Sequence, residues 1–248
     1  MIDSRLRTRY YPRMRKDAYI DPSSAWNKEY EQQGIPSSHR EEPSGVLRWA
    51  LANVPFLKDS SIDSAADLGC GTGRNAFALM EAGAKTVEAM DFSETALDIA
   101  RRRRGAQSIN FIQGDVTKPL PFADNAHDFV SDIFVYFHQL PDADRAKYRR
   151  EIRRILKPNG LFLVSVATNN DGYYSSCTKG PLANIESTVP LTWDPVAQVG
   201  NILLSRDQFF DEFSDSFNLQ MYWVKKKLGI MHGNEYLRET AAVLWTAK

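Results

Sequence analysis

The glycine-rich stretch at residues 66–75, which reads ADLGCGTGRN, constrains the fold of this chain more than any other feature. A short apolar segment and Asp67 precede three glycines at alternate positions, and an apolar helical pattern follows. Glycine is required where φ is positive or where a ligand lies against bare backbone. Free amides at the start of a helix favour a negative group. The stretch therefore predicts a strand, a tight turn that faces a ligand, and a helix.

The spacing of these glycines differs from that of a dinucleotide-binding loop, which reads G-x-G-x-x-G with a small last residue. Arg74 occupies that last position. The pattern D-x-G-x-G-x-G, which begins at Asp67, resembles motif I of the class I S-adenosylmethionine (SAM) dependent methyltransferases. The resemblance implies that the methionine part of SAM lies over Gly69, Cys70 and Gly71. It also implies that Asp67 forms hydrogen bonds near the amino group of SAM.

Composition limits the class of protein. A chain of 248 residues can bury a core as one α/β domain. Its 31 basic and 31 acidic residues cancel, so net charge favours neither nucleic acid nor a membrane surface. Cys70 and Cys177 are the only cysteines and form no metal-type pair, which indicates a reducing compartment. No apolar run approaches the roughly 20 residues of a membrane helix, and no secretory signal is recognisable. We therefore expect a cytoplasmic protein without a metal.

The second predicted strand, residues 86–90, ends at an acidic residue. Asp91 lies 20 residues after Gly71 (91 − 71), and an acid at this place accepts hydrogen bonds from both ribose hydroxyls of a nucleotide. Phe92 follows and is expected to stack on the adenine. A turn or cap role is the alternative for Asp91, and its position directly after a strand favours ribose binding.

Two further strands are expected at residues 110–113 and 128–134. In the family that this chain resembles, an acid after the third strand contacts the adenine amino group and the next apolar residue lies against the ring. Asp115 and Val116 occupy these positions. In open α/β sheets the ligand binds beyond the carboxyl ends of the strands. We therefore expect the end of the fourth strand to reach the pocket, with two residues at the cofactor and one at the substrate: Asp132, Ile133 and Phe134.

The segment Phe137 to Pro141, which reads FHQLP, resembles the HHLP stretch of the same family, with Gln139 in place of the second histidine. His138 is a candidate catalytic base because histidine titrates near neutrality. The alternative is a residue that shapes the pocket wall. A helix over residues 142–156, the turn LKPNG and a strand from Leu161 also match the family pattern.

Two segments outside this pattern are expected to act as lids. Residues 168–204 form an insertion after the fifth strand, and long connections there are more often functional than not. Small-molecule methyltransferases tend to place their acceptor cap here, so Tyr173 and Tyr174 are candidates for catalysis and substrate contact, with aromatic turn residues as the alternative. Residues 1–43 form an arm and lid, which carries three candidate substrate contacts: Tyr19, Trp26 and Tyr30. A solvated arm and simple aromatic packing are the alternatives there.

The expected fold is a Rossmann-like, seven-stranded α/β sheet, mostly parallel, with helices on both faces. Residues 219–224 and 240–245 are expected to complete it as an antiparallel strand pair. Residues 44–248 would form the SAM-binding domain, with the insertion as its substrate cap.

The expected function is methyl transfer from SAM to a small-molecule acceptor in a closed pocket. A same-fold alternative is attack on the aminocarboxypropyl group of SAM, which forms azetidine-2-carboxylate and releases methylthioadenosine. A protein or nucleic-acid methyltransferase is disfavoured because no N/D-P-P-Y/F motif or basic stripe is present. A SAM-binding module without catalysis is disfavoured further. We expect no nucleic-acid or membrane partner, and a monomer or homodimer.

Overall fold

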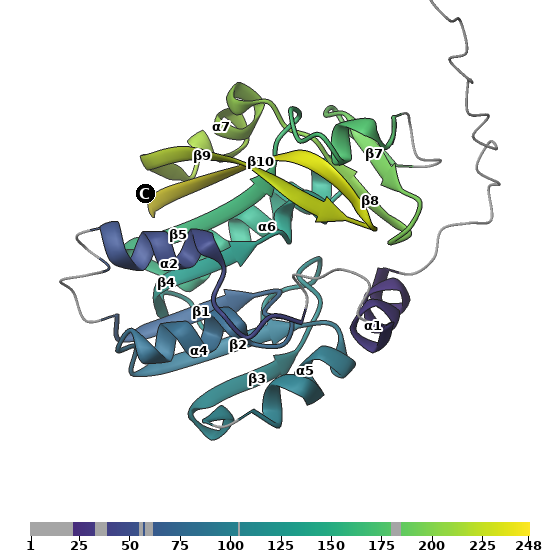
Figure 1. Cartoon of the computed structure of the whole chain (residues 1–248). Helices are drawn as coiled ribbons and strands as arrows, with labels where there is room; N and C mark the ends of the chain where they lie inside the picture. Colours follow the sequence, from purple (N-terminus) through teal and green to yellow (C-terminus); the bar gives the residue numbers. More distant parts are fainter. Residues whose placement is uncertain (1–21, 33–38, 55–56, 58–61, 104, 180–184) are drawn as a thin grey trace, which may run out of the picture.

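A computed structural model describes residues 22–32, 39–54, 57, 62–103, 105–179 and 185–248. Its centre is a seven-stranded sheet in the order β3-β2-β1-β4-β5-β10-β9 (Figure 1). The parallel strands are β1 (Ser64–Leu68), β2 (Thr86–Asp91), β3 (Ile109–Gln113), β4 (His127–Ile133) and β5 (Leu156–Ala167). The antiparallel pair is β9 (Phe217–Met231) and β10 (Asn234–Ala247). The predicted mostly parallel sheet with an antiparallel C-terminal pair is confirmed.

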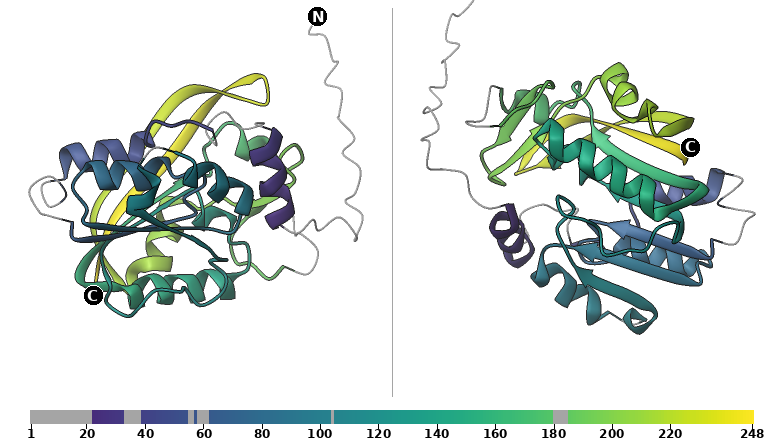
Figure 2. Two further views of the ribbon diagram at one scale, coloured as in Figure 1. Left: turned by 90° about the horizontal axis from the view of Figure 1, so that it is seen from below. Right: turned by 180° about the vertical axis from the view of Figure 1, so that it is seen from behind.

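Helices cover both faces of this sheet, as Figures 1 and 2 show. One apolar core includes buried side chains of α2 (Gly45–Asn53), α4 (Arg74–Glu81) and α5 (Glu94–Arg101). The other includes α6 (Asp142–Ile155) and α7 (Arg206–Ser214). Among the described residues, no helix is long and apolar enough to cross a membrane.

Helices α5 and α7 each begin with a side-chain cap. The Ser93 hydroxyl accepts a hydrogen bond from the Ala96 amide at 3.2 Å, which caps α5. Ser205 and Gln208 form a reciprocal capping box at the start of α7. A cap satisfies amides that have no partner within the helix, so these short polar signals locate the two helix starts from local sequence alone.

The start of β5 differs from the prediction. We expected residues 156–160 to form a turn before a strand at Leu161, whereas β5 begins at Leu156, directly after α6. Leu156 is fully buried and pairs with His127, and the next pair joins Phe129 to Leu161. The register therefore shifts around Asn159, whose φ of 64° is in the left-handed region that asparagine tolerates. The residues expected to form a turn therefore produce a register shift inside β5.

A second, smaller sheet lies within the predicted insertion. It consists of β6 (Thr178–Lys179), β7 (Leu191–Asp194) and β8 (Val199–Ile202), which pair antiparallel. The distal half of the β9–β10 hairpin pairs only with itself and extends away from the central strands (Figure 2). The insertion holds this hairpin, because the Gly172 amide donates to the Leu237 carbonyl at 2.8 Å and Asp171 forms an ion pair with Arg238 at 2.8 Å.

Candidate functional site

The glycine loop turns the chain sharply at the carboxyl end of β1. The Gly69 amide donates to the Met90 carbonyl at 2.7 Å, which brings the loop across the end of β2. Gly69 and Gly71 have φ values of 67° and 54°. A Cβ atom at Gly69 would lie 2.0 Å from the Val135 side chain, and one at Gly71 would lie 2.5 Å from the Tyr30 hydroxyl oxygen. The two positions therefore require glycine, and other segments of the chain close in on the loop.

Asp67, the last but one residue of β1, is only 1% exposed. Its Oδ1 accepts a hydrogen bond from the Ser131 hydroxyl at 2.7 Å. Its Oδ2 is buried and has no hydrogen-bond partner among the described residues. Burial raises the pKa of Asp67 to about 7, against the opposing effects of the Ser131 hydrogen bond and the Arg74 charge. A buried carboxylate oxygen of this kind is a ready acceptor for a cationic group of a ligand.

Asp91, at the end of β2, joins the glycine loop to the start of α5. Its Oδ2 accepts a hydrogen bond from the Gly71 amide at 2.8 Å, and its Oδ1 accepts one from the Ser93 amide at 2.9 Å. Burial raises its pKa to about 6. The turn and cap role that was the alternative is thus present. Because each carboxylate oxygen has a second lone pair, ribose hydroxyls can still bind there. Phe92, beside it, is half-buried.

The residues after β3 form a turn at the protein surface. Asp115 is exposed, and its Oδ1 accepts a hydrogen bond from the Thr117 amide at 2.8 Å. Val116 is half-buried and packs against the apolar core. Cys70, in the glycine loop, is buried, and its Sγ lies 3.7 Å from the Gly71 carbonyl oxygen. Burial raises the pKa of this thiol well above its usual value, so Cys70 stays protonated.

Asp132 is placed differently from our expectation. It is fully buried, and its Oδ1 accepts hydrogen bonds from the Val135 and Tyr136 amides at 2.9 and 3.1 Å. Its Oδ2 accepts a hydrogen bond from the Tyr148 hydroxyl at 2.9 Å. The carboxylate therefore shapes the turn after β4, and the expectation that this side chain itself reaches the pocket is corrected.

That turn holds Phe134 in the left-handed region, with φ at 72°. This conformation costs a residue other than glycine roughly 1–2 kcal/mol, and such strain is typical of sites whose surroundings enforce it. The Phe134 ring is half-buried and meets Phe137 edge-on at 5.7 Å. Ile133 is also half-buried and packs against the core on the α4 side. Ile133 and Phe134 therefore both pack against other side chains of the chain.

His138 lies in a short 3₁₀ helix, η2 (Tyr136–His138). Its Nδ1 is 3.1 Å from the Gly200 carbonyl oxygen, so Nδ1 carries the hydrogen and Nε2 is the acceptor. Burial lowers the pKa of His138 to about 4. A general base acts best when its pKa is near the working pH. The low value favours the alternative role, a neutral residue in the pocket wall.

Helix α1 (Pro22–Gln32) covers the carboxyl ends of β1 and β2. The Ser93 hydroxyl donates to Asn27 Oδ1 at 2.6 Å. The Trp26 ring lies 6.4 Å from the Tyr30 ring and meets His138 edge-on at 5.2 Å. Two of the predicted lid residues, Trp26 and Tyr30, therefore lie beside the glycine loop and the histidine. Tyr19 lies outside the described residues.

Tyr173 and Tyr174, which belong to the insertion, are buried against the hairpin. Both backbone amides donate to Asp171 Oδ1 at 3.0 Å, and the two rings lie 5.1 Å apart. The Arg238 guanidinium lies 5.1 Å from the Tyr174 ring centre. Tyr174 also meets Phe137 edge-on at 4.9 Å, next to His138 in η2. Burial raises the pKa of both tyrosines well above its usual value, so neither is a base at neutral pH.

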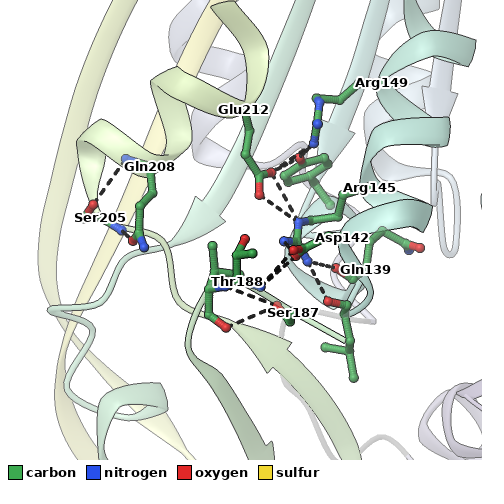
Figure 3. Close-up of polar contacts among 12 residues, drawn as sticks. Gln139, Asp142, Arg145, Arg149, Ser187, Thr188, Ser205, Gln208 and Glu212 are labelled. Atoms are coloured by element: carbon green, nitrogen blue, oxygen red, sulfur yellow. Dashed lines mark hydrogen bonds and ion pairs between the residues drawn. The ribbon is translucent and has the colours of Figure 1, made fainter. Parts of the chain in front are cut away.

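A buried ion network fixes the loop that follows His138 (Figure 3). The Arg145 side chain is 1% exposed and donates through Nε to Glu212 Oε1 at 2.9 Å and through Nη1 to the Gln139 carbonyl at 3.0 Å. It also pairs with Asp142, whose Oδ2 accepts a hydrogen bond from the Thr188 amide at 2.8 Å. The network thus joins α6, α7 and the insertion to the loop beside the site.

Sequence reasoning missed several residues that the structure brings to this region. Ser131 lies opposite Asp67 in the β1–β4 register and could have been noticed as a polar residue inside a buried strand. Val135 packs against Gly69 without any sequence signal. Thr192 and Asn201 face each other across β7 and β8, a pairing that no local pattern indicates.

Comparison with known proteins gives a consistent picture. A family model described as a methyltransferase domain matches residues 65–160. The cypemycin N-terminal methyltransferase of a Streptomyces species is 31% identical over 145 residues, which cover 56% of this chain and 55% of that protein. The demethylmenaquinone methyltransferase of Clavibacter sepedonicus is 33% identical over 117 residues, which cover 47% and 46%. The chain therefore spans about half the length of the curated relatives it matches.

Solved structures extend the similarity of fold over more of the chain. One is the Burkholderia thailandensis 1,6-didemethyltoxoflavin-N1-methyltransferase with bound 1,6-didemethyltoxoflavin and S-adenosylhomocysteine. It matches with a TM-score of 0.64 at 18% identity, over 96% of this chain and 93% of that chain. A SAM-dependent methyltransferase of Methanosarcina mazei matches with a TM-score of 0.61 at 19% identity, over 77% and 96%. Residues 65–160 thus match a methyltransferase domain, and the chain has the fold of SAM-dependent methyltransferases of known structure, which supports SAM as its cofactor.

Proposed function

We propose that this protein transfers the methyl group of SAM to a small-molecule acceptor in a closed pocket. The observation that carries the proposal is the glycine loop under α1. A buried carboxylate oxygen without a hydrogen-bond partner among the described residues, Asp67 Oδ2, lies at the end of β1 beside that loop. The Tyr30 hydroxyl approaches the loop from α1. A loop enclosed in this way suits a small ligand better than a macromolecular surface.

The residues at the loop fit SAM. The free oxygen of Asp67 suits the ammonium group of the ligand, because a buried charge requires a partner of opposite sign. Asp91 retains acceptor capacity for two hydroxyl groups while its backbone contacts hold the loop in place. The absence of side chains at Gly69 and Gly71 lets Val135 and the Tyr30 hydroxyl pack directly against the loop backbone.

SAM supplies an already activated methyl group when it is bound. The chain has therefore to bind both reactants, hold them in line and exclude water. Orientation of this kind supplies up to about 7–11 kcal/mol of barrier reduction. In this proposal α1 excludes water through Trp26 and Tyr30, and His138 contributes a neutral acceptor at Nε2 to the wall. With a pKa of about 4, His138 orients an acceptor through hydrogen bonding and does not store a proton at neutral pH.

A mass-spectrometric product assay tests the proposal. Purified protein is incubated with SAM alone and with pools of small-molecule acceptors, and the nucleoside product is identified. We expect S-adenosylhomocysteine only when an acceptor is present, and a loss of product in Asp67→Ala. A Ser214→Ala variant, at the far end of α7, is the matched control with wild-type product yield.

The same assay separates methyl transfer from the other chemistry expected of this fold. Release of methylthioadenosine from SAM alone would overturn the proposal and indicate attack on the aminocarboxypropyl group, with azetidine-2-carboxylate as the second product. The relatives and solved structures named above are methyltransferases by their descriptions, which supports methyl transfer.

A further inference from the structure

The small sheet of the insertion carries a buried polar face. Thr192 in β7 and Asn201 in β8 are direct cross-strand partners, so their side chains emerge on the same face. Both residues are fully buried. Thr192 Oγ1, Asn201 Nδ2 and Asn201 Oδ1 have no hydrogen-bond partner among the described residues. We call these two residues the cap pair.

Unpaired polar atoms of this kind are unusual in a buried position. Native proteins pair the large majority of their buried polar groups, and a group left unpaired costs about 1–3 kcal/mol. The Asn201 carboxamide lacks a hydrogen-bond partner for both its NH₂ group and its oxygen, and the Thr192 hydroxyl opposite also lacks one. Burying these groups without partners is costly unless a bound molecule pairs with them. A bound molecule with its own donor and acceptor would satisfy these groups.

The cap pair lies next to the wall of the SAM site. Gly200, which precedes Asn201 in β8, accepts the hydrogen bond from His138 Nδ1 at 3.1 Å. His138 in turn contacts Trp26 on α1, the helix that brings Tyr30 to the glycine loop. One hydrogen bond and one ring contact thus connect the small sheet to the lid over the loop.

The carboxylate nearest the cap pair along β7 already has polar neighbours. Asp194, two residues after Thr192 on the same face of β7, accepts hydrogen bonds through Oδ1 from the Val196 and Ala197 amides at 2.9 and 3.0 Å. Its Oδ2 lies 3.7 Å from His232 Nε2. The groups that remain without hydrogen bonds in the cap pair are a hydroxyl and a carboxamide, both neutral. A neutral partner with its own donor and acceptor satisfies them without burying a new charge.

We propose, on the basis of the proposed methyl transfer, that Thr192 and Asn201 form the acceptor-recognition site. The acceptor is then a neutral, planar molecule that presents a hydrogen-bond donor beside an acceptor, as the lactam edge of a nitrogen heterocycle does. The Asn201 carboxamide pairs with both groups of such an edge, and the Thr192 hydroxyl adds a third contact. The buried rings of Phe137 and Tyr174 pack against each other, and Phe137 also contacts His138.

Binding to defined probes tests this assignment independently of turnover. Protein loaded with S-adenosylhomocysteine is titrated with 2-pyridone and uracil, which carry a lactam edge, and with benzoate, which does not. Ligand-observed NMR measures binding. We expect the lactams to bind the wild type in preference to benzoate, and Asn201→Leu and Thr192→Val to weaken this binding about tenfold or more. Equal binding of the lactams to wild type and variants, or no binding to the wild type, would overturn the assignment.

Stability provides a second readout with the opposite sign. Replacing an unpaired buried polar group by an apolar one of similar shape is neutral or stabilising. We therefore expect Thr192→Val and Asn201→Leu to melt at or above the wild-type temperature and to bind S-adenosylhomocysteine as the wild type does. Thr246→Val, in β10 of the main sheet, is the matched control and should leave lactam binding unchanged. A marked loss of stability in both cap-pair variants would instead indicate a structural role and would refute a recognition site.

The two proposals fail in different ways. If the wild type makes no S-adenosylhomocysteine from any acceptor pool but binds lactams through Asn201, the methyl-transfer proposal fails and the site remains. If product forms and the cap-pair variants make it at the wild-type rate, the site assignment fails and methyl transfer remains.

Discussion

The buried carboxyl group of Asp67 predicts that SAM binding depends on pH. Burial raises the pKa of Asp67 from the ordinary value of an aspartate to about 7, because a charge without a partner is costly in the interior. A carboxyl group with a raised pKa takes up a proton on folding, so the free energy of unfolding falls as pH rises from about 4 to about 7. The cationic amino group of a ligand reverses this preference, since it favours the carboxylate.

The magnitude follows from the fraction of Asp67 that is ionised. With a pKa of about 7, only about a tenth of the free protein carries the carboxylate at pH 6, and about a hundredth at pH 5. If the ligand requires that form, the apparent Kd rises about tenfold for each pH unit below 7. The α-amino group of the ligand, which belongs to a free amino acid, is more basic than a peptide N-terminus with its pKa of about 7.7–8.0, so it stays protonated from pH 5 to 7. Affinity should therefore increase from pH 5 to pH 7 and then level off.

Isothermal titration calorimetry with S-adenosylhomocysteine, between pH 5.5 and 7.5, measures this dependence. Repeating the titration at pH 6 in buffers of different ionisation enthalpy counts the proton that binding should release. Asp67→Asn should bind weakly with a much flatter pH profile, and Asp91→Asn, which removes a carboxyl group with a pKa of about 6, should keep the slope between pH 6 and 7. A flat profile in the wild type, or an unchanged slope in Asp67→Asn, would refute the reasoning.

Three substitutions test other parts of the structure. Gly71→Ala places a side chain at a φ of 54°, which costs roughly 1–2 kcal/mol, and its Cβ atom would lie 2.5 Å from the Tyr30 hydroxyl oxygen. Calorimetry should therefore show weaker binding of S-adenosylhomocysteine. Unchanged affinity would contradict this prediction. Arg145→Met removes the buried guanidinium that pairs with Glu212 and should lower the free energy of unfolding, measured in urea, by about 3 kcal/mol. A loss below 1 kcal/mol would contradict a stabilising role for this ion pair. Ser93→Ala removes the cap of α5 and should cost about 0.5–2 kcal/mol in the same assay.

The parts of the fold that sequence predicted are those specified by local signals. The glycine loop and the acids that follow the second and third predicted strands each depend on residues within a few positions of one another. Their outcome is therefore independent of how distant segments pack. The predicted start of β5 was wrong because it depends on contacts between distant segments. LKPNG has the composition of a turn, but burial of Leu156 against β4 overrides that preference.

Side-chain direction was the harder problem within the site. A position at the end of β4 does not tell which way Asp132 points, because its rotamer is determined by two amides and by Tyr148, 16 residues further along the chain. Thr192 and Asn201 are harder still, since the chemistry of the pair exists only once β7 and β8 have formed. Such sites follow from the pairing of strands rather than from any motif.

His138 contacts both the small sheet and helix α1, and its protonation state affects how a pH experiment is interpreted. Its Nδ1 donates to Gly200 in the small sheet, and its ring contacts Trp26 in the lid. A charged imidazolium at this position would alter both contacts. Burial holds the pKa of His138 at about 4, so the ring stays neutral throughout the range in which Asp67 titrates. His138, which lies between the small sheet and helix α1, therefore keeps the same charge from pH 5.5 to 7.5. A change in affinity over that range reports the carboxyl groups under the lid, and not a rearrangement of the lid at His138.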